Sequence, residues 1–220
     1  MTTLTSAPAA DVLRQLFADA ARTQTAFRER MSKLTPEERA SWGAGGPDSR
    51  QFFLSAAKET HLAVSPETGN LLYLLARSRS ARTVVEFGTS FGVSTICLAA
   101  ALRDNGGGLL IGTEFEPGKA AAARRSLAEA GLDDLVDIRD GDALDTLSRG
   151  IPGPVDLVFL DGAKNLYLDV LRLLEPHLAP NALVVADNAN RSPELLEHLR
   201  TSGSYLPTGF GNDVEIALKV

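Results

Sequence analysis

The feature that most constrains this 220-residue chain is a change of pattern near Arg82. Beyond it, short apolar runs rich in Val, Leu, Ile and Phe alternate with stretches of helical spacing. Such alternation is typical of βαβ units around a parallel sheet. The runs are continuously apolar, as expected for strands that helices cover on both faces. We therefore predict an α/β fold with strands at Thr83–Phe87, Leu109–Glu114, Val136–Asp140, Asp156–Leu160 and Leu183–Ala186.

Two further strand-like segments close the chain, at Ser204–Phe210 and Asp213–Val220. Gly211 and Asn212 lie between them, and this dipeptide between strand-like segments favours a tight antiparallel turn. The chain is therefore expected to end in an antiparallel hairpin.

The N-terminal part of the chain has helical spacing instead. Apolar residues recur at helical intervals over 10–31, which predicts an amphipathic helix. Thr35 and Ser65 each stand before Pro-Glu, a combination of N-cap and first-turn proline that predicts two helix starts. The second of these helices should run to Arg77. A loop at 43–47 should separate the first from a further helix at about 48–63.

Composition and charge exclude several classes of protein. The formal net charge is −6 and no run of Lys or Arg stands out, so a nucleic-acid partner is not expected. No apolar run approaches the length of a membrane span, so no membrane segment is expected. A lone cysteine, Cys97, and an N-terminus without signal-peptide features predict a cytoplasmic protein.

In an open α/β sheet, ligands bind beyond the carboxyl ends of the strands. The first predicted strand runs into a turn, 86–94, whose glycines Gly88 and Gly92 would open a helix. Its N–H groups and positive dipole end can hold an anionic group such as a carboxylate. The alternative is that the two glycines serve packing alone, as they do in many such turns.

Three acidic residues, Glu86, Glu114 and Asp142, gather near the same predicted edge. Their charge disfavours a pyrophosphate and suits a cofactor with a sulfonium, a ribose diol and an adenine. Glu114 is expected to accept the ribose hydroxyls, as acidic residues do at that position in dinucleotide folds. Asp142 is expected to receive the adenine amino group, with a turn or helix cap as its alternative role.

Oxygen-bearing side chains also follow the fourth and fifth predicted strands. Asp161, Asp187 and Asn188 are hard ligands suited to magnesium, with manganese or calcium as alternatives. Otherwise the two aspartates would be helix N-caps and Asn188 a loop residue. Lys164 is usually a solvated residue type, but three residues after Asp161 it could face the same pocket as a general base.

The ordered series of motifs resembles the class I S-adenosylmethionine-dependent O-methyltransferases of the catechol and caffeoyl-coenzyme A type. The resemblance covers 62–188 and is carried by Ser65-x-x-x-Gly69, 86–94, Thr113-Glu114, 141–144, Asp161-x-x-Lys164-x-x-Tyr167 and Asp187-Asn188. It implies a Rossmann-like sheet of seven strands, mostly parallel, a homodimer, metal ligands Asp161, Asp187 and Asn188, and Lys164 as the base. The cofactor contacts we predict are Val64, Glu86, Gly88, Thr89, Ser90, Ser94, Glu114, Phe115, Asp142, Ala143 and Asp161.

The chain departs from the family pattern around the acceptor. After Asn188, the segment 189–193 leads directly into a helix instead of the usual long substrate loop, and Gly162-Ala163 replaces the commoner Ala-Asp. The N-terminal helices with Trp42 and Phe52-Phe53 match no motif. We expect one domain, with a helical segment at 1–62 that caps the acceptor or makes dimer contacts, and a methyltransferase core at 63–220.

The predicted function is therefore metal-dependent O-methylation of a catechol-like or vicinal-diol small molecule, with Asp161 and Lys164 as the catalytic residues. Two alternatives stay open: a metal-independent N-, C- or carboxyl-methyltransferase, and a non-catalytic cofactor-binding regulator. A nicotinamide-dependent oxidoreductase fits the glycine spacing least well. His61, His177 and His198 lie on predicted helices without ligand spacing, and Cys97 is expected in the core.

Overall fold

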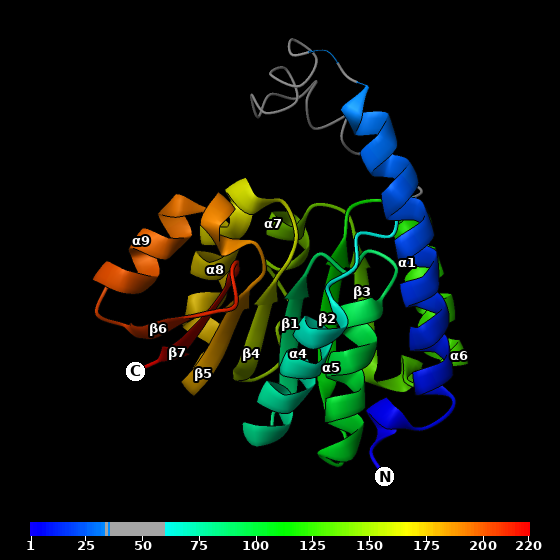
Figure 1. The fold of residues 1–220 in the computed structure, drawn as a ribbon. Helices are drawn as coiled ribbons and strands as arrows, with labels where there is room; N and C mark the ends of the chain where they lie inside the picture. The colour runs from blue at the N-terminus through cyan, green and yellow to red at the C-terminus, as the bar shows by residue number, and fades with distance from the viewer. Residues whose placement is uncertain (34, 36–59) are drawn as a thin grey trace.

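A computed structural model of the chain describes residues 1–33, 35 and 60–220. A sheet of seven strands runs through it in the order β3-β2-β1-β4-β5-β7-β6, with helices on both faces (Figure 1). The strands are β1 Thr83–Phe87, β2 Leu109–Glu114, β3 Val136–Asp140, β4 Val155–Leu160, β5 Leu178–Ala186, β6 Tyr205–Phe210 and β7 Val214–Lys219.

Strands β1 to β5 pair in parallel, and β7 joins β5 and β6 antiparallel, so the predicted α/β class and the closing hairpin are confirmed. Strand β5 begins at Leu178, earlier than predicted. Leu178 pairs with Val155, and the register then shifts before Leu157 pairs with Leu183. The sequence did not predict this first part of β5, because Pro180 and Asn181 interrupt its apolar pattern.

Helices cover the sheet in two layers. One layer holds α1 Ala9–Ser32, α4 Pro66–Ser78, α5 Val93–Asp104 and α6 Pro117–Glu129, and the other holds α7 Ala143–Thr146, α8 Tyr167–Leu174 and α9 Pro193–Thr201. The predicted cap of α4 is confirmed: the Ser65 hydroxyl accepts a hydrogen bond from the Thr68 N–H at 3.1 Å, and Pro66 opens the helix.

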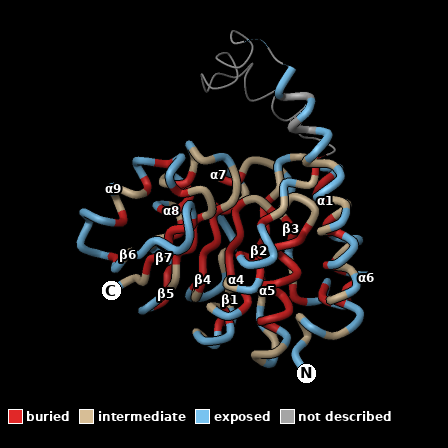
Figure 2. The backbone as a smooth tube through the Cα atoms, in the orientation of Figure 1, coloured by how far each residue is buried: buried red, intermediate tan, exposed pale blue. Residues whose placement is uncertain are grey.

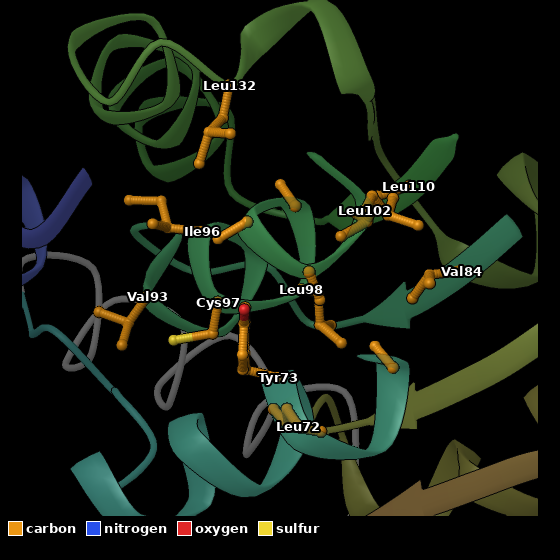
Figure 3. Close-up of a cluster of buried hydrophobic side chains, with 14 of the residues drawn as sticks. Leu72, Tyr73, Val84, Val93, Ile96, Cys97, Leu98, Leu102, Leu110 and Leu132 are labelled. Atoms are coloured by element: carbon orange, nitrogen blue, oxygen red, sulfur yellow. The ribbon is translucent and has the colours of Figure 1, made fainter. Parts of the chain in front are cut away.

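Two apolar cores lie between these layers and the sheet (Figure 2). Successive strand residues alternate between them, so Val84 belongs to one core and its neighbour Val85 to the other. Helix α5 is buried along its length, with Cys97 packed among leucines and Tyr73 (Figure 3). Cys97 is buried, so the expectation of a core cysteine is confirmed, and burial raises the pKa of its thiol to about 12.

The N-terminal helix α1 packs against α5 and α6 through Leu13 and Leu16. The helix predicted from Thr35, the loop at 43–47 and the residues Trp42, Phe52 and Phe53 lie outside the described residues. The predicted helix at 48–63 is wrong for its last residues, because 60–63 are irregular. In the described ranges, no helix is both long and apolar enough to cross a membrane.

Candidate active site

The loops that follow β1, β4 and β5 are tied together at one edge of the sheet. The Asp161 N–H donates to the Phe87 carbonyl at 2.8 Å, and the Asp187 N–H donates to the Leu160 carbonyl at 2.9 Å. These bonds continue the parallel ladder past the strand ends. The candidate residues after β1, β4 and β5 are therefore neighbours, as the sequence predicted.

Glu86 is the last residue but one of β1 and has no exposed surface. Its carboxylate accepts hydrogen bonds from the hydroxyls of Thr89, Ser94 and Thr95 at 2.9, 2.6 and 2.6 Å. Burial raises the pKa of Glu86, while the three donors oppose the shift. The visible role of Glu86 is to hold the glycine turn and the start of α5 together, and its direct contact with a cofactor stays a prediction.

The glycine turn is built from left-handed backbone. Gly88, Ser90 and Gly92 have φ values of 101°, 50° and 93°. A Cβ at Gly88 would come within 2.7 Å of the Asp161 backbone, so close contact between the two loops requires glycine there. Gly92 is the N-cap of α5 and, having no side chain, gives no capping hydrogen bond to the first N–H groups of the helix.

A small pocket lies beside the start of α5. It is lined by His61, Leu62, Ala63, Gly88, Thr89, Ser90, Phe91, Val93 and Ser94. Four predicted cofactor contacts in this list, Gly88, Thr89, Ser90 and Ser94, thus share one pocket. Val64, also predicted, is buried next to Ala63.

The carboxylates of Glu114 and Asp142 both bind backbone N–H groups. Glu114 accepts from the Ser90 N–H at 2.8 Å and from the Glu116 N–H at 2.9 Å. Asp142 accepts from the Leu144 N–H at 3.0 Å and caps α7, so its alternative role as a helix cap is confirmed. Phe115, beside Glu114, is 45% exposed. The predicted contacts of these residues and of Ala143 with ribose and adenine stay predictions.

On the β4 side, Asp161, Lys164 and Tyr167 form a connected chain. The Lys164 Nζ donates to Asp161 Oδ1 at 2.9 Å and to Tyr167 Oη at 2.6 Å. Tyr167, which is fully buried, donates in turn to the Asp187 carbonyl at 2.9 Å. Burial raises the pKa of Asp161 to about 7, the charges of Asp187 and Glu86 add to the shift, and Lys164 opposes it.

Asp187 and Asn188 complete this side. Burial also raises the pKa of Asp187, whose carboxylate accepts a hydrogen bond from the Asn188 amide. Asn188 has a left-handed φ of 51° at the start of the 3-10 turn Ala189–Arg191. Neither aspartate caps a described helix, so the N-cap alternative is wrong for both. Among the described residues, no three His, Cys, Asp or Glu side chains form a metal-binding group, and the predicted trio relies on an asparagine.

Sequence reasoning gave no role to Tyr167 and none to His61. Tyr167 belongs to a quoted motif, but only the fold shows that its hydroxyl links Lys164 to Asp187 at the end of β5. His61 lies in the irregular segment before α4 rather than on a helix, and its ring stacks on Phe91. No spacing rule connects positions 61 and 91.

A family model described as a methyltransferase domain matches residues 85–189. The catechol O-methyltransferase of Niastella koreensis is 37% identical over 151 residues, which are 67% of this chain and 67% of that protein. The chain belongs to the class I S-adenosylmethionine-dependent O-methyltransferases. The resemblance read from the motifs is therefore confirmed, and the nicotinamide-dependent alternative is wrong.

Two other similarities agree. The catechol O-methyltransferase of Mycobacterium tuberculosis is 38% identical over 141 residues, 64% of this chain and 63% of that protein. The solved structure of the O-methyltransferase TomG from Streptomyces achromogenes, in complex with SAM, has a TM-score of 0.62 and 30% identity over 92% of this chain and 99% of that one. The chain thus spans about two thirds of the length of the curated relatives and nearly all of this solved neighbour.

Proposed function

We propose that this methyltransferase moves the methyl group of S-adenosylmethionine to a hydroxyl of a catechol-like small molecule, with a divalent cation present. One observation carries the proposal. Asp161 and Asp187 are two partly buried carboxylates at one sheet edge, and Lys164 lies against the first of them. Two relatives named catechol O-methyltransferase support the same acceptor class.

S-adenosylmethionine would bind at the ends of β1, β2 and β3. The open start of α5 suits the carboxylate of the methionine end, because its N–H groups and dipole favour an anion. Glu114, with Phe115 beside it, ends β2 and suits the ribose, and Asp142 with Ala143 follows β3 on the adenine side. The SAM present in the solved TomG structure supports this choice of cofactor.

The side-chain oxygen atoms that follow β4 and β5 fit a divalent cation. Asp161, Asp187 and Asn188 offer hard oxygen atoms, which magnesium and manganese prefer. The pKa of both carboxyls is raised, since each is partly buried and the charge of Asp187 disfavours ionisation of Asp161. A cation held there would relieve this cost, and when bound it would stabilise a negatively charged acceptor oxygen as a Lewis acid.

The remaining steps belong to the protein's own side chains. Methyl transfer is a direct displacement, so the acceptor oxygen, the methyl carbon and the sulfur must be held in line. We assign removal of the acceptor proton to the Lys164 Nζ, which hydrogen bonds to Asp161 and Tyr167 hold in one place. Because Tyr167 is itself fixed to the Asp187 carbonyl, the base and the two carboxylates would move as one unit.

Isothermal titration of S-adenosylmethionine, followed by turnover of a catechol panel with magnesium and after chelation, tests the proposal. Binding together with turnover that chelation abolishes would support it. Activity that survives chelation would favour the metal-independent alternative, and binding without turnover of any acceptor would favour the non-catalytic one. Absence of binding would contradict the proposed function altogether.

A further inference from the structure

The ring of His61 is held in a fixed place above the glycine turn. It stacks on the Phe91 ring with 3.7 Å between centroids and 4° between planes. Its backbone is tied to α1 on both sides, because the His61 N–H donates to Thr23 Oγ1 and the Gln24 amide donates to the His61 carbonyl, both at 3.0 Å. His61 is therefore positioned by α1 and by the loop after β1 together.

Two polar atoms of this region are buried without a hydrogen-bond partner. Over the described part of the chain, only four side-chain nitrogen or oxygen atoms are in this state, and His61 Nδ1 and Ser90 Oγ are two of them. Both residues line the pocket at the start of α5. A buried polar atom without a partner destabilises the folded protein, so two in one pocket point to a ligand that binds both.

The surroundings of the pocket favour an anion. The uncapped start of α5 presents its N–H groups and the positive end of its dipole. Lys119, which is 7% exposed, adds a positive charge with its Nζ 5.5 Å from the centre of the Phe91 ring. Two carboxylates flank the turn, and both already have donors: Glu86 accepts from three hydroxyls, and Glu114 accepts from the Ser90 and Glu116 N–H groups.

The protonation of His61 is compatible with this. Burial lowers the pKa of the imidazole, and nearby Lys119 and Arg22 act in the same direction while Asp19 opposes them. A neutral imidazole carries one N–H, and a carboxylate can accept it at Nδ1 just as it accepts the hydroxyl of Ser90. S-adenosylmethionine contains one negatively charged group, the carboxylate of its methionine part.

We propose that His61 Nδ1 and Ser90 Oγ bind the methionine carboxylate of the cofactor. The inference rests on the proposed function, since it assumes that S-adenosylmethionine binds at this edge. It assigns a cofactor-binding role to a histidine that lies outside every motif of the family. Phe91 then acts as a positioning residue, because its ring fixes the plane of the imidazole.

The test compares two ligands that differ in the carboxylate. S-adenosylhomocysteine contains the amino-acid part, and 5′-methylthioadenosine retains the adenosine and the thioether without it. In His61→Phe, which preserves an aromatic ring for stacking and removes the nitrogen, the Kd for S-adenosylhomocysteine should rise about tenfold or more, as expected for a lost hydrogen bond to a charged group. The Kd for 5′-methylthioadenosine should stay within about twofold.

Three further variants make the comparison independent of folding defects. Ser90→Ala should show the same selective loss, and His61→Asn, which retains a polar atom near the Nδ1 position, should recover part of the affinity. His177→Phe is the matched control, because His177 is exposed and lies on the 3-10 turn Glu175–His177. It should leave both affinities unchanged.

The outcomes separate this inference from the function on which it depends. Wild-type protein that binds neither ligand contradicts the proposed function. Wild-type protein that binds both, with His61→Phe and Ser90→Ala shifting the two affinities equally or not at all, overturns the role of His61 and Ser90 and leaves the methyltransferase intact.

Discussion

The active-site edge has two halves, one at the ends of β1 and β2 and one at the ends of β4 and β5, and their carboxylates have different partners. On the β1–β2 side, Glu86 accepts hydrogen bonds from three hydroxyls, and Glu114 accepts from two backbone N–H groups. On the β4–β5 side, Asp161 and Asp187 lie near each other, and both rely on the charge of Lys164. The carboxylates of the first half are held by uncharged donors, whereas in the second half the charge of Asp187 disfavours ionisation of Asp161, a cost that a bound cation would reduce.

Removal of one carboxylate from the second half should produce the largest effect. In Asp161→Ala we expect turnover to fall about 1000-fold, roughly 4 kcal/mol of transition-state stabilisation, since both the ligand set and the anchor of Lys164 are lost. The Kd for S-adenosylmethionine should change by less than about threefold, because all the other predicted cofactor contacts are retained. Steady-state kinetics and isothermal titration measure the two quantities.

Asn165→Ala offers a control in the same turn, since the described contacts give Asn165 no part in the chain from Asp161 to Asp187. It should leave turnover within about twofold. If cofactor affinity in Asp161→Ala fell in parallel with turnover, the separation of the edge into two halves would be wrong.

Gly88 lies where the two halves touch, so its substitution should disturb both. In Gly88→Ala the new Cβ would meet the Asp161 backbone at 2.7 Å at a φ of 101°. We expect a loss of about 3 kcal/mol in the free energy of unfolding, together with weaker cofactor binding and slower turnover. Urea unfolding measures the first effect.

Gly107→Ala separates backbone strain from the clash. Gly107 has a similar φ of 104°, but a Cβ there would meet no atom within 4 Å. It should cost about 1 kcal/mol and leave the site unchanged. Equal losses in the two variants would show that close approach at Gly88 has no special importance.

This junction also shows where sequence reasoning ends. The strands β1, β2 and β3 match their predicted bounds, because a continuous apolar run between turn residues defines a buried parallel strand. The edge residues followed from the rule that ligands bind beyond strand ends. Tyr167 and His61 could not be assigned, because their roles depend on contacts between segments that are far apart in the sequence and on which atoms burial leaves without partners.

Removal of Glu86 should weaken the first half without touching the second directly. In Glu86→Ala, the hydroxyls of Thr89, Ser94 and Thr95 lose their acceptor in a buried place. We expect the free energy of unfolding to fall by about 2 kcal/mol, less than the sum of three lost bonds because a buried charge is removed with them. Thermal and urea unfolding check this, and an unchanged stability would mean that the cluster is not a structural tie.

The smallest effect we predict is a dependence of stability on pH that belongs to Glu86. Burial raises the pKa of Glu86 above its ordinary value of 4.5, so the folded state holds the proton more tightly than the unfolded state does. Its contribution to stability is then complete below about pH 4.5 and is lost as the pH rises through the folded-state pKa. Between pH 5 and pH 8, wild-type protein should therefore lose stability relative to Glu86→Gln, which does not titrate. Urea unfolding of both proteins at the two pH values measures the difference, in which the titration of other groups cancels. A difference of the opposite sign would mean that the three hydroxyls stabilise the carboxylate more than burial penalises it, and that the first half of the edge carries a full negative charge beside the cofactor.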